Sequence, residues 1–145
     1  MNNENFSQLI KLLNIENIQI IDTHESVFDN PKIPDGTEIN IETARRFNKE
    51  DPRIDKNTKT IEFHLKYTFT FSIEETKYFL AEYIILISFT VLDMDTFLEL
   101  FADPELKKMF MEKQLNRTLW SILRGTVLDA FNRHSLPPVS LPWIV

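Results

Sequence analysis

A strict alternation of apolar and polar residues over positions 61–73 constrains the fold more than any other feature of the sequence. Every second position there is apolar: Ile61, Phe63, Leu65, Tyr67, Phe69, Phe71 and Ile73. Because successive side chains of a β-strand point to opposite faces of the sheet, a period of two predicts a strand with one apolar and one polar face. We therefore expect a strand that contacts the core on one side.

Three further segments are typical of strands. Residues 15–28 and 38–47 have strand-like composition, and turn signals rich in proline, asparagine and glycine separate them. Residues 77–91 are apolar on both faces in the middle, which predicts a strand covered on both sides. The polar residues 48–58 are expected to form an exposed connection. The sequence thus predicts four strands.

The hydrophobic period changes from two to about 3.6 after the last expected strand, which predicts helices. Asp95 is expected to cap a short helix over 95–101 by accepting hydrogen bonds from the amides of its first turn. Asp103, followed by a proline, predicts the start of a long amphipathic helix that covers about 105–134. Inside that helix Gly125 costs about 1 kcal/mol relative to alanine, which predicts close approach of another group.

The length of 145 residues fits one domain with a sizeable core. We expect a single α+β domain over 1–145. Its parts are a short helical lead-in, the four strands, the helices and a proline-rich apolar tail, at 1–14, 15–92, 95–134 and 135–145.

Composition excludes several classes of function. The net charge of −6 repels a phosphate backbone, so we expect no nucleic-acid partner. The absence of cysteine excludes disulfides, thiolate catalysis and cysteine-ligated metals, and it fits a reducing compartment. The sequence shows no secretory signal and no run of roughly 18 apolar residues, so we expect a cytoplasmic protein without membrane insertion.

No motif for catalysis or for a cofactor is found. None of the three histidines has metal-ligand spacing: His24, His64 and His134. The two glycines stand alone and form no phosphate-binding loop. Glu62 and Glu82 could approach each other, although they are more simply surface charges that alternate with lysines across neighbouring strands. We therefore expect no enzyme activity, no metal and no cofactor.

Aromatic and apolar residues at element ends or beside the helical stripe are the strongest sign of binding. Each alone is more simply part of the core's rim, but as a set they are hard to bury, and large exposed apolar patches mark interfaces. The candidates for contact with a polypeptide client are Phe28, Phe47, Phe97, Phe101, Phe110 and Trp143. The candidates for contact between subunits are Leu119, Trp120, Leu123 and Val127.

Two short motifs occur in an order that indicates a known family. The long helix is followed by Arg133, Ser135-Leu136-Pro137, Val139, Leu141 and Ile144, and upstream of it Phe79-Leu80-Ala81-Glu82-Tyr83 leads to Phe89. Together with the order of four strands, short helix and long helix, these motifs resemble the SecB protein-export chaperone family.

The resemblance implies a fold, an assembly and a function. The fold would be a twisted four-stranded antiparallel sheet with the long helix across one face. Subunits would pair through edge strands and long helices into a homodimer, and dimers into a homotetramer. The protein would be an ATP-independent holdase that keeps unfolded polypeptides or preproteins in apolar grooves for protein export, hands them to a translocation motor, and needs no nucleotide or metal.

Three departures from the family leave alternatives open. His134 occupies the position of a family glycine, residues 90–95 replace a glycine-rich segment, and the chain stops at Val145, before the family's second C-terminal helix and acidic tail. One alternative is therefore a dedicated SecB-like binding protein for a single partner, such as an antitoxin or a regulatory factor. An enzyme with a pocket on the sheet would require a cluster of perturbed titratable groups, of which the sequence gives no sign.

Overall fold

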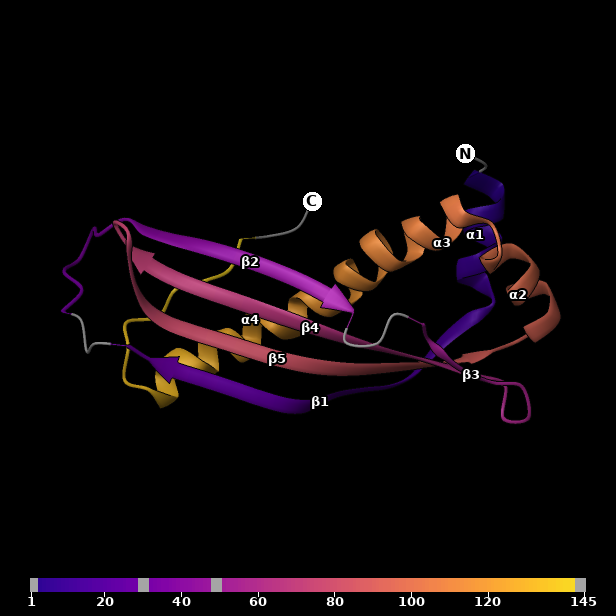
Figure 1. Ribbon diagram of the computed structural model, residues 1–145, viewed down its shortest axis with the longest axis horizontal. Helices are drawn as coiled ribbons and strands as arrows, with labels where there is room; N and C mark the ends of the chain where they lie inside the picture. The colour runs from indigo at the N-terminus through magenta and orange to yellow at the C-terminus, as the bar shows by residue number, and fades with distance from the viewer. Residues whose placement is uncertain (1–2, 29–31, 48–50, 143–145) are drawn as a thin grey trace. The chain divides into compact units, whose positions relative to one another are not determined.

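The structure, a computed structural model, describes residues 3–28, 32–47 and 51–142 (Figure 1). Its helices and strands are α1 (Asn3–Lys11), β1 (Leu13–Val27), β2 (Ile39–Phe47), β3 (Arg53–Asp55), β4 (Thr60–Ile73), β5 (Thr76–Val91), α2 (Met94–Phe101), α3 (Pro104–Met109), the π-helical turn η1 (Phe110–Gln114) and α4 (Leu115–Arg133). Among these residues no helix is both long and apolar enough to cross a bilayer. Trp143, a predicted client-binding residue, lies outside the described residues.

The strands form one sheet in the order β1-β5-β4-β2, and β3 pairs with β4. Strand β2 pairs antiparallel with β4, so that Ile39 lies opposite Ile73 and Phe47 opposite Leu65. The predicted α+β class, an antiparallel sheet with a long C-terminal helix, is confirmed. The prediction of four strands missed β3, because three residues inside a polar connection give no periodic signal.

The chain divides into two compact units. Unit 1 consists of Met1–Gln19, Lys49–His64 and Leu86–Leu119. Unit 2 consists of Ile20–Asn48, Leu65–Ile85 and Trp120–Val145. Strands β1, β4 and β5 and helix α4 each contribute residues to both units.

The core of unit 1 is built from aromatic rings. The ring of Phe63 on β4 lies 5.5 Å from that of Phe110 and 6.3 Å from that of Phe101, measured between centroids. Phe89 of β5 lies 6.0 Å from Phe63 in an edge-on arrangement, and Phe97 stacks on Phe101 at 5.0 Å. Such pairs add about 0.5–1.5 kcal/mol each to the gain from burial. These rings therefore hold α2 and η1 against β4 and β5.

The core of unit 2 lies between the strands and α4, which runs along one face of the strands there (Figure 1). The ring of Phe131 lies 4.8 Å from that of Phe71 and 5.1 Å from that of Phe79. One end of this contact is closed by Trp120, whose ring lies 5.9 Å from Phe69. The apolar face predicted for residues 61–73 is thus the face that α4 covers in this unit.

The helix starts follow the expected chemistry, with one correction. Asp103 caps α3 by accepting a hydrogen bond from the amide of Glu105 at 3.0 Å, as predicted. The prediction that Asp95 caps α2 was wrong, because Asp93 is the cap. Its extended backbone lets the carboxylate accept from the amide and the hydroxyl of Thr96, at 3.1 and 2.7 Å.

The long helix departs from the prediction in two places. Within the expected range 105–134, the π-helical turn Phe110–Gln114 separates α3 from α4. A π turn contains an extra residue and rotates the side chains that follow, a change that the apolar spacing alone did not reveal. The close neighbour predicted for Gly125 is absent from the described chain, because a Cβ atom at this position would meet nothing within 4 Å.

We predict that Phe63→Ala lowers the free energy of unfolding by about 3–5 kcal/mol, because it removes a buried ring and leaves a cavity. The matched control is Phe28→Ala, whose ring is 43% exposed and whose loss should cost about 1 kcal/mol or less. Urea unfolding followed by circular dichroism measures both variants. Equal losses would contradict the aromatic core of unit 1.

Candidate functional site

The predicted client-binding residues fall into two groups. Phe28, directly after β1, is 43% exposed, and Phe47, at the end of β2, is half-buried under the guanidinium of Arg45, 6.0 Å from its ring centre. The other described members are buried in the core of unit 1: Phe97, Phe101 and Phe110. The expectation that these three rings are exposed is wrong for the single chain, because α2 and η1 need them for packing. Their contact with clients stays a prediction.

The residues predicted for subunit contact are also covered. Helix α4 turns one apolar stripe toward the strands, and this stripe contains all four: Leu119, Trp120, Leu123 and Val127. The exposed side of α4 in unit 2 carries Ser121, Ile122, Gly125 and Asp129 instead. A role of the four buried residues between subunits stays a prediction, while another chain can reach the exposed side of α4 without displacing any part of this chain.

Large apolar side chains are exposed at several places in each unit. In unit 2 they are Ile21, Val27, Phe28 and Ile122, which are 37–44% exposed. In unit 1 they are Ile15, Ile54 and Leu92, which are 38–63% exposed. Most of them lie on or directly after β1, an edge strand of the sheet. An edge strand also presents unpaired backbone N–H and C=O groups, so the β1 edge offers the two features that bind an extended polypeptide.

A carboxylate clamp joins β1, β5 and the end of α4 in unit 2. Glu25, with 8% of its side chain exposed, accepts a hydrogen bond from the hydroxyl of Tyr83 at 2.7 Å. It also accepts from Arg133 Nη2 at 2.6 Å and contacts His134 Nε2 at 3.1 Å. Sequence reasoning missed this cluster, because its other members are 58 to 109 positions away from Glu25 in the sequence.

The protonation of the clamp follows from its contacts. Burial raises the pKa of Glu25, but the hydrogen bonds from Tyr83, His134 and Arg133 and the charge of Arg133 together place it below the ordinary value of 4.5. Burial, with the carboxylate of Glu25, raises the pKa of Tyr83, so its hydroxyl remains a donor. A general acid or base works best with a pKa near the operating pH. The clamp is therefore suited to holding structure.

The helix end next to the clamp is a Schellman motif. Ser135 has a left-handed backbone with φ of 56°, its amide donates to the carbonyl of Asn132, and the amide of Leu136 donates to the carbonyl of Phe131 at 2.9 Å. The residue that turns the chain is thus Ser135, and His134, at the position of the family's glycine, is free to contact Glu25.

After this turn the tail, defined here as residues 135–142, returns along α4. Trp120 Nε1 donates to the carbonyl oxygen of Pro142 at 2.7 Å, and Arg124 Nε donates to that of Leu141 at 2.8 Å. Leu136 and Leu141 are 5% and 1% exposed. The tail is therefore a fixed part of unit 2 in this structure.

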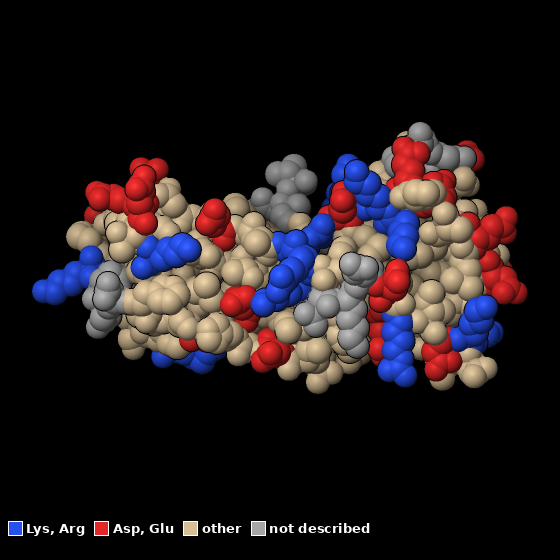
Figure 2. Space-filling view, in the orientation of Figure 1, with Lys and Arg blue, Asp and Glu red and all other residues tan. Residues whose placement is uncertain are grey.

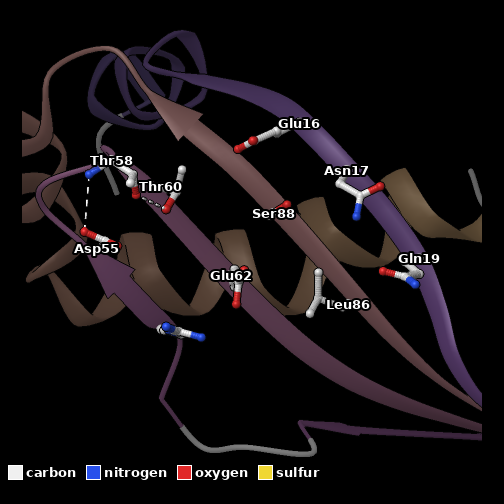
Figure 3. A pocket seen from close by; sticks show the side chains of 10 residues that line it. Glu16, Asn17, Gln19, Asp55, Thr58, Thr60, Glu62, Leu86 and Ser88 are labelled. Carbon is white, nitrogen blue, oxygen red and sulfur yellow. Dashed lines mark hydrogen bonds between the residues drawn. The ribbon is translucent and has the colours of Figure 1, made fainter.

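A polar depression of about 470 Å³ lies on the strands of unit 1 (Figure 3). It is lined by Glu16, Asn17, Gln19, Arg53, Asp55, Thr58, Thr60, Glu62, Leu86 and Ser88. Asp55 is engaged by the backbone amides of Thr58 and Asn57, whose hydrogen bonds lower its pKa and stabilise the turn between β3 and β4. Within the described ranges no three His, Asp or Glu side chains are grouped to hold a metal ion.

Charges of both signs are interspersed on the face shown in Figure 2. The prediction of cross-strand surface pairs is confirmed for Lys66 of β4 and Glu82 of β5, where Lys66 Nζ lies 3.1 Å from Glu82 Oε2. Mixed charges keep a surface soluble, and they give a phosphate backbone no broad basic patch to bind on this face.

One solved structure is similar over nearly the whole chain: the Mycobacterium tuberculosis Rv1957 SecB-like chaperone in complex with a ChAD peptide from the Rv1956 HigA1 antitoxin. The TM-score is 0.70, the identity is 15%, and the match covers 97% of each chain. The chain has a SecB-like fold. The fold that the resemblance implied is therefore confirmed.

A second solved structure is that of a Streptococcus agalactiae protein of unknown function, with a TM-score of 0.47 and 14% identity. The match covers 90% of this chain and 97% of that protein. No protein-family model and no curated protein matches the sequence. The similarity of this chain to SecB-like proteins therefore rests on three-dimensional structure and on the short motifs of the sequence.

We predict that the clamp makes stability depend on pH through Glu25. Its folded-state pKa is lowered, so its contribution is present above the unfolded value of 4.5 and is lost as the pH falls through the folded value. Glu25→Gln should cost about 1–3 kcal/mol at pH 7 and much less at pH 3, measured by urea unfolding. Glu42→Gln, an exposed residue of β2, is the control. A loss for Glu25→Gln that is equal at both pH values would contradict the clamp.

Proposed function

We propose that this protein is an ATP-independent holdase that binds unfolded polypeptides on exposed apolar surface. The observation that carries the proposal is the β1 edge, where Ile21, Val27 and Phe28 are exposed beside unpaired strand backbone. An unfolded chain offers apolar side chains and free backbone groups, and both find partners there. The SecB-like fold supports the proposal, since the similar solved structure is that of a chaperone.

Holding requires no chemical step. Burial of apolar area drives association without any energy input, so the proposed activity needs neither nucleotide nor metal. The net charge of −6 favours polypeptides over nucleic acids as clients. We place the activity in the cytoplasm, without enzyme chemistry, and delivery of preproteins to an export motor remains the narrower prediction from the resemblance.

We include self-association in the proposal. The exposed side of α4 carries Ile122 beside Gly125, where the absence of a side chain leaves open space. A second copy can approach the helix closely at this position, and β2, the edge strand at the other side of the sheet, can pair with another strand. A homodimer or homotetramer is therefore expected, and light scattering that finds the mass of a single chain at micromolar concentration would exclude it.

A second function, a dedicated binding protein for one partner, is favoured by a different observation. The similar SecB-like chaperone was solved with a peptide from an antitoxin, which is a single defined ligand. On this alternative the apolar edge of β1 would recognise one peptide, such as that of an antitoxin or a regulatory factor. Capture on a tagged column separates the two: one stoichiometric partner supports the dedicated role, and many unrelated unfolded chains support the holdase.

We predict that the double variant Ile21→Ser and Phe28→Ser, at the β1 edge, suppresses the aggregation of reduced α-lactalbumin at least about tenfold less effectively than the wild type. Each change removes apolar area that a bound client would cover. Full burial of one such side chain contributes about 1.5–3 kcal/mol to the free energy of binding. The assay is light scattering of the aggregating client at rising chaperone concentration. Leu92→Ser, which removes a 63% exposed apolar side chain from unit 1, is the matched control.

Both variants must retain the particle mass and the circular dichroism spectrum of the wild type. If the folded double variant protects the client as well as the wild type does, Ile21 and Phe28 are not client contacts and the proposal loses its site. If neither protein protects any unfolded client, the holdase function itself is excluded.

A further inference from the structure

The tail binds α4 in an extended form that runs antiparallel to the helix. Residues 135–142 contain no helix or strand, and Figure 1 shows the gold trace leaving the end of α4 and turning back. Arg124 holds the carbonyl of Leu141, and Trp120, one helical turn earlier, holds that of Pro142. Later tail residues thus meet earlier helix residues.

The contacts that hold the tail involve chemical groups that any polypeptide can present. Both hydrogen bonds end on backbone carbonyl oxygens, so they do not depend on the tail's side chains. The buried tail side chains are two leucines five positions apart, Leu136 and Leu141, whereas the prolines between them are exposed. Aliphatic side chains and free carbonyls are the groups that an unfolded chain also presents.

The prolines of the tail explain why side chains of α4 hold the tail, rather than the backbone of a strand. Pro137, Pro138 and Pro142 have no backbone N–H, so they cannot donate to a neighbouring strand, and their fixed φ favours an extended chain. The indole and guanidinium donors of α4 satisfy carbonyls that no strand partner satisfies. The surface therefore accepts an extended chain without requiring a complete hydrogen-bond ladder.

We propose that the tail-binding surface of α4, around Trp120 and Arg124, is a binding site for an extended segment of another polypeptide, and that the tail occupies it as an internal competitor. The ligand class is an extended segment with an aliphatic side chain beside free backbone carbonyls. The inference rests on the proposed function, since this ligand is the client of a holdase, and it adds a second place of binding and a means of regulation.

The tail is anchored unequally along its length. Its base is fixed by the Schellman turn at Ser135 and by the contacts of Arg133 and His134 with Glu25. Within residues 135–142 the far part is held by the two hydrogen bonds and by Leu141. In the proposal this far part dissociates while the base and α4 stay folded. A competitor held in this way lowers the apparent affinity for a ligand by the fraction of time that the surface is free.

A labelled peptide with the sequence of residues 135–142 tests the inference. Its affinity for the full-length protein is measured by fluorescence anisotropy. Leu141→Ser removes the far anchor, so this variant should bind the peptide at least about tenfold more tightly than the wild type. Ser140→Ala, at the exposed neighbouring position, should bind it like the wild type. A peptide with serine in place of Leu141 should not bind.

A second variant tests the surface itself. Trp120→Phe in the Leu141→Ser background keeps an aromatic ring beside Phe69 and removes the indole donor together with part of the ring. The peptide should then bind about three- to tenfold more weakly than to Leu141→Ser alone, the range expected for one neutral hydrogen bond. Circular dichroism verifies the fold of each variant, and Leu141→Ala replaces Leu141→Ser if the latter does not fold. Unchanged affinity in the double variant would overturn the assignment of the surface.

Three other results would overturn the inference. Equal peptide affinity for the wild type and Leu141→Ser means that the tail is no competitor, and weaker binding to Leu141→Ser means that the tail is part of the site. Loss of the oligomer in Leu141→Ser without peptide binding means that the tail serves a second copy of the chain. Aggregation assays separate this inference from the holdase proposal. If the wild type protects the client but no variant binds the peptide, the holdase proposal stands and the internal competitor is excluded. If the peptide binds but the protein does not protect the client, the competitor stands and the holdase proposal is excluded.

Discussion

The packing of α4 on the strands of unit 2 is the contact on which the rest of that unit depends. Phe131 lies 4.8 Å from Phe71 and 5.1 Å from Phe79, and Trp120 lies against Phe69. An amphipathic helix has a single apolar stripe. Because the stripe of α4 packs on the strands, the opposite side of this helix is mostly polar. The surfaces that we propose for clients therefore lie elsewhere, at the β1 edge and under the tail.

The end of α4 determines where the tail goes. The Schellman turn reverses the chain at Ser135, and Glu25 holds Arg133 and His134 at that point. Buried charge that is fully hydrogen-bonded fixes one arrangement more firmly than apolar packing does, since a broken contact leaves a carboxylate without partners. The clamp thus directs residues 135–142 back along α4, where the tail meets two side-chain donors.

Local patterns predicted the elements well and their partners poorly. The alternation over 61–73 gave β4 its faces, and the Asp103 cap placed the start of α3, because both signals are contained in neighbouring residues. The burial of Phe97, Phe101 and Phe110 depends on which helix covers which strand, so no local signal could indicate it. The Glu25 clamp likewise joins residues that only the tertiary fold brings together.

Hydrogen exchange on the folded protein, with and without reduced α-lactalbumin, tests the central claim most directly, because it locates a bound polypeptide residue by residue. We predict slower exchange of backbone amides along residues 20–28 of β1, with no change in the core of unit 1. Unchanged exchange along residues 20–28 while the client is bound would contradict the central claim.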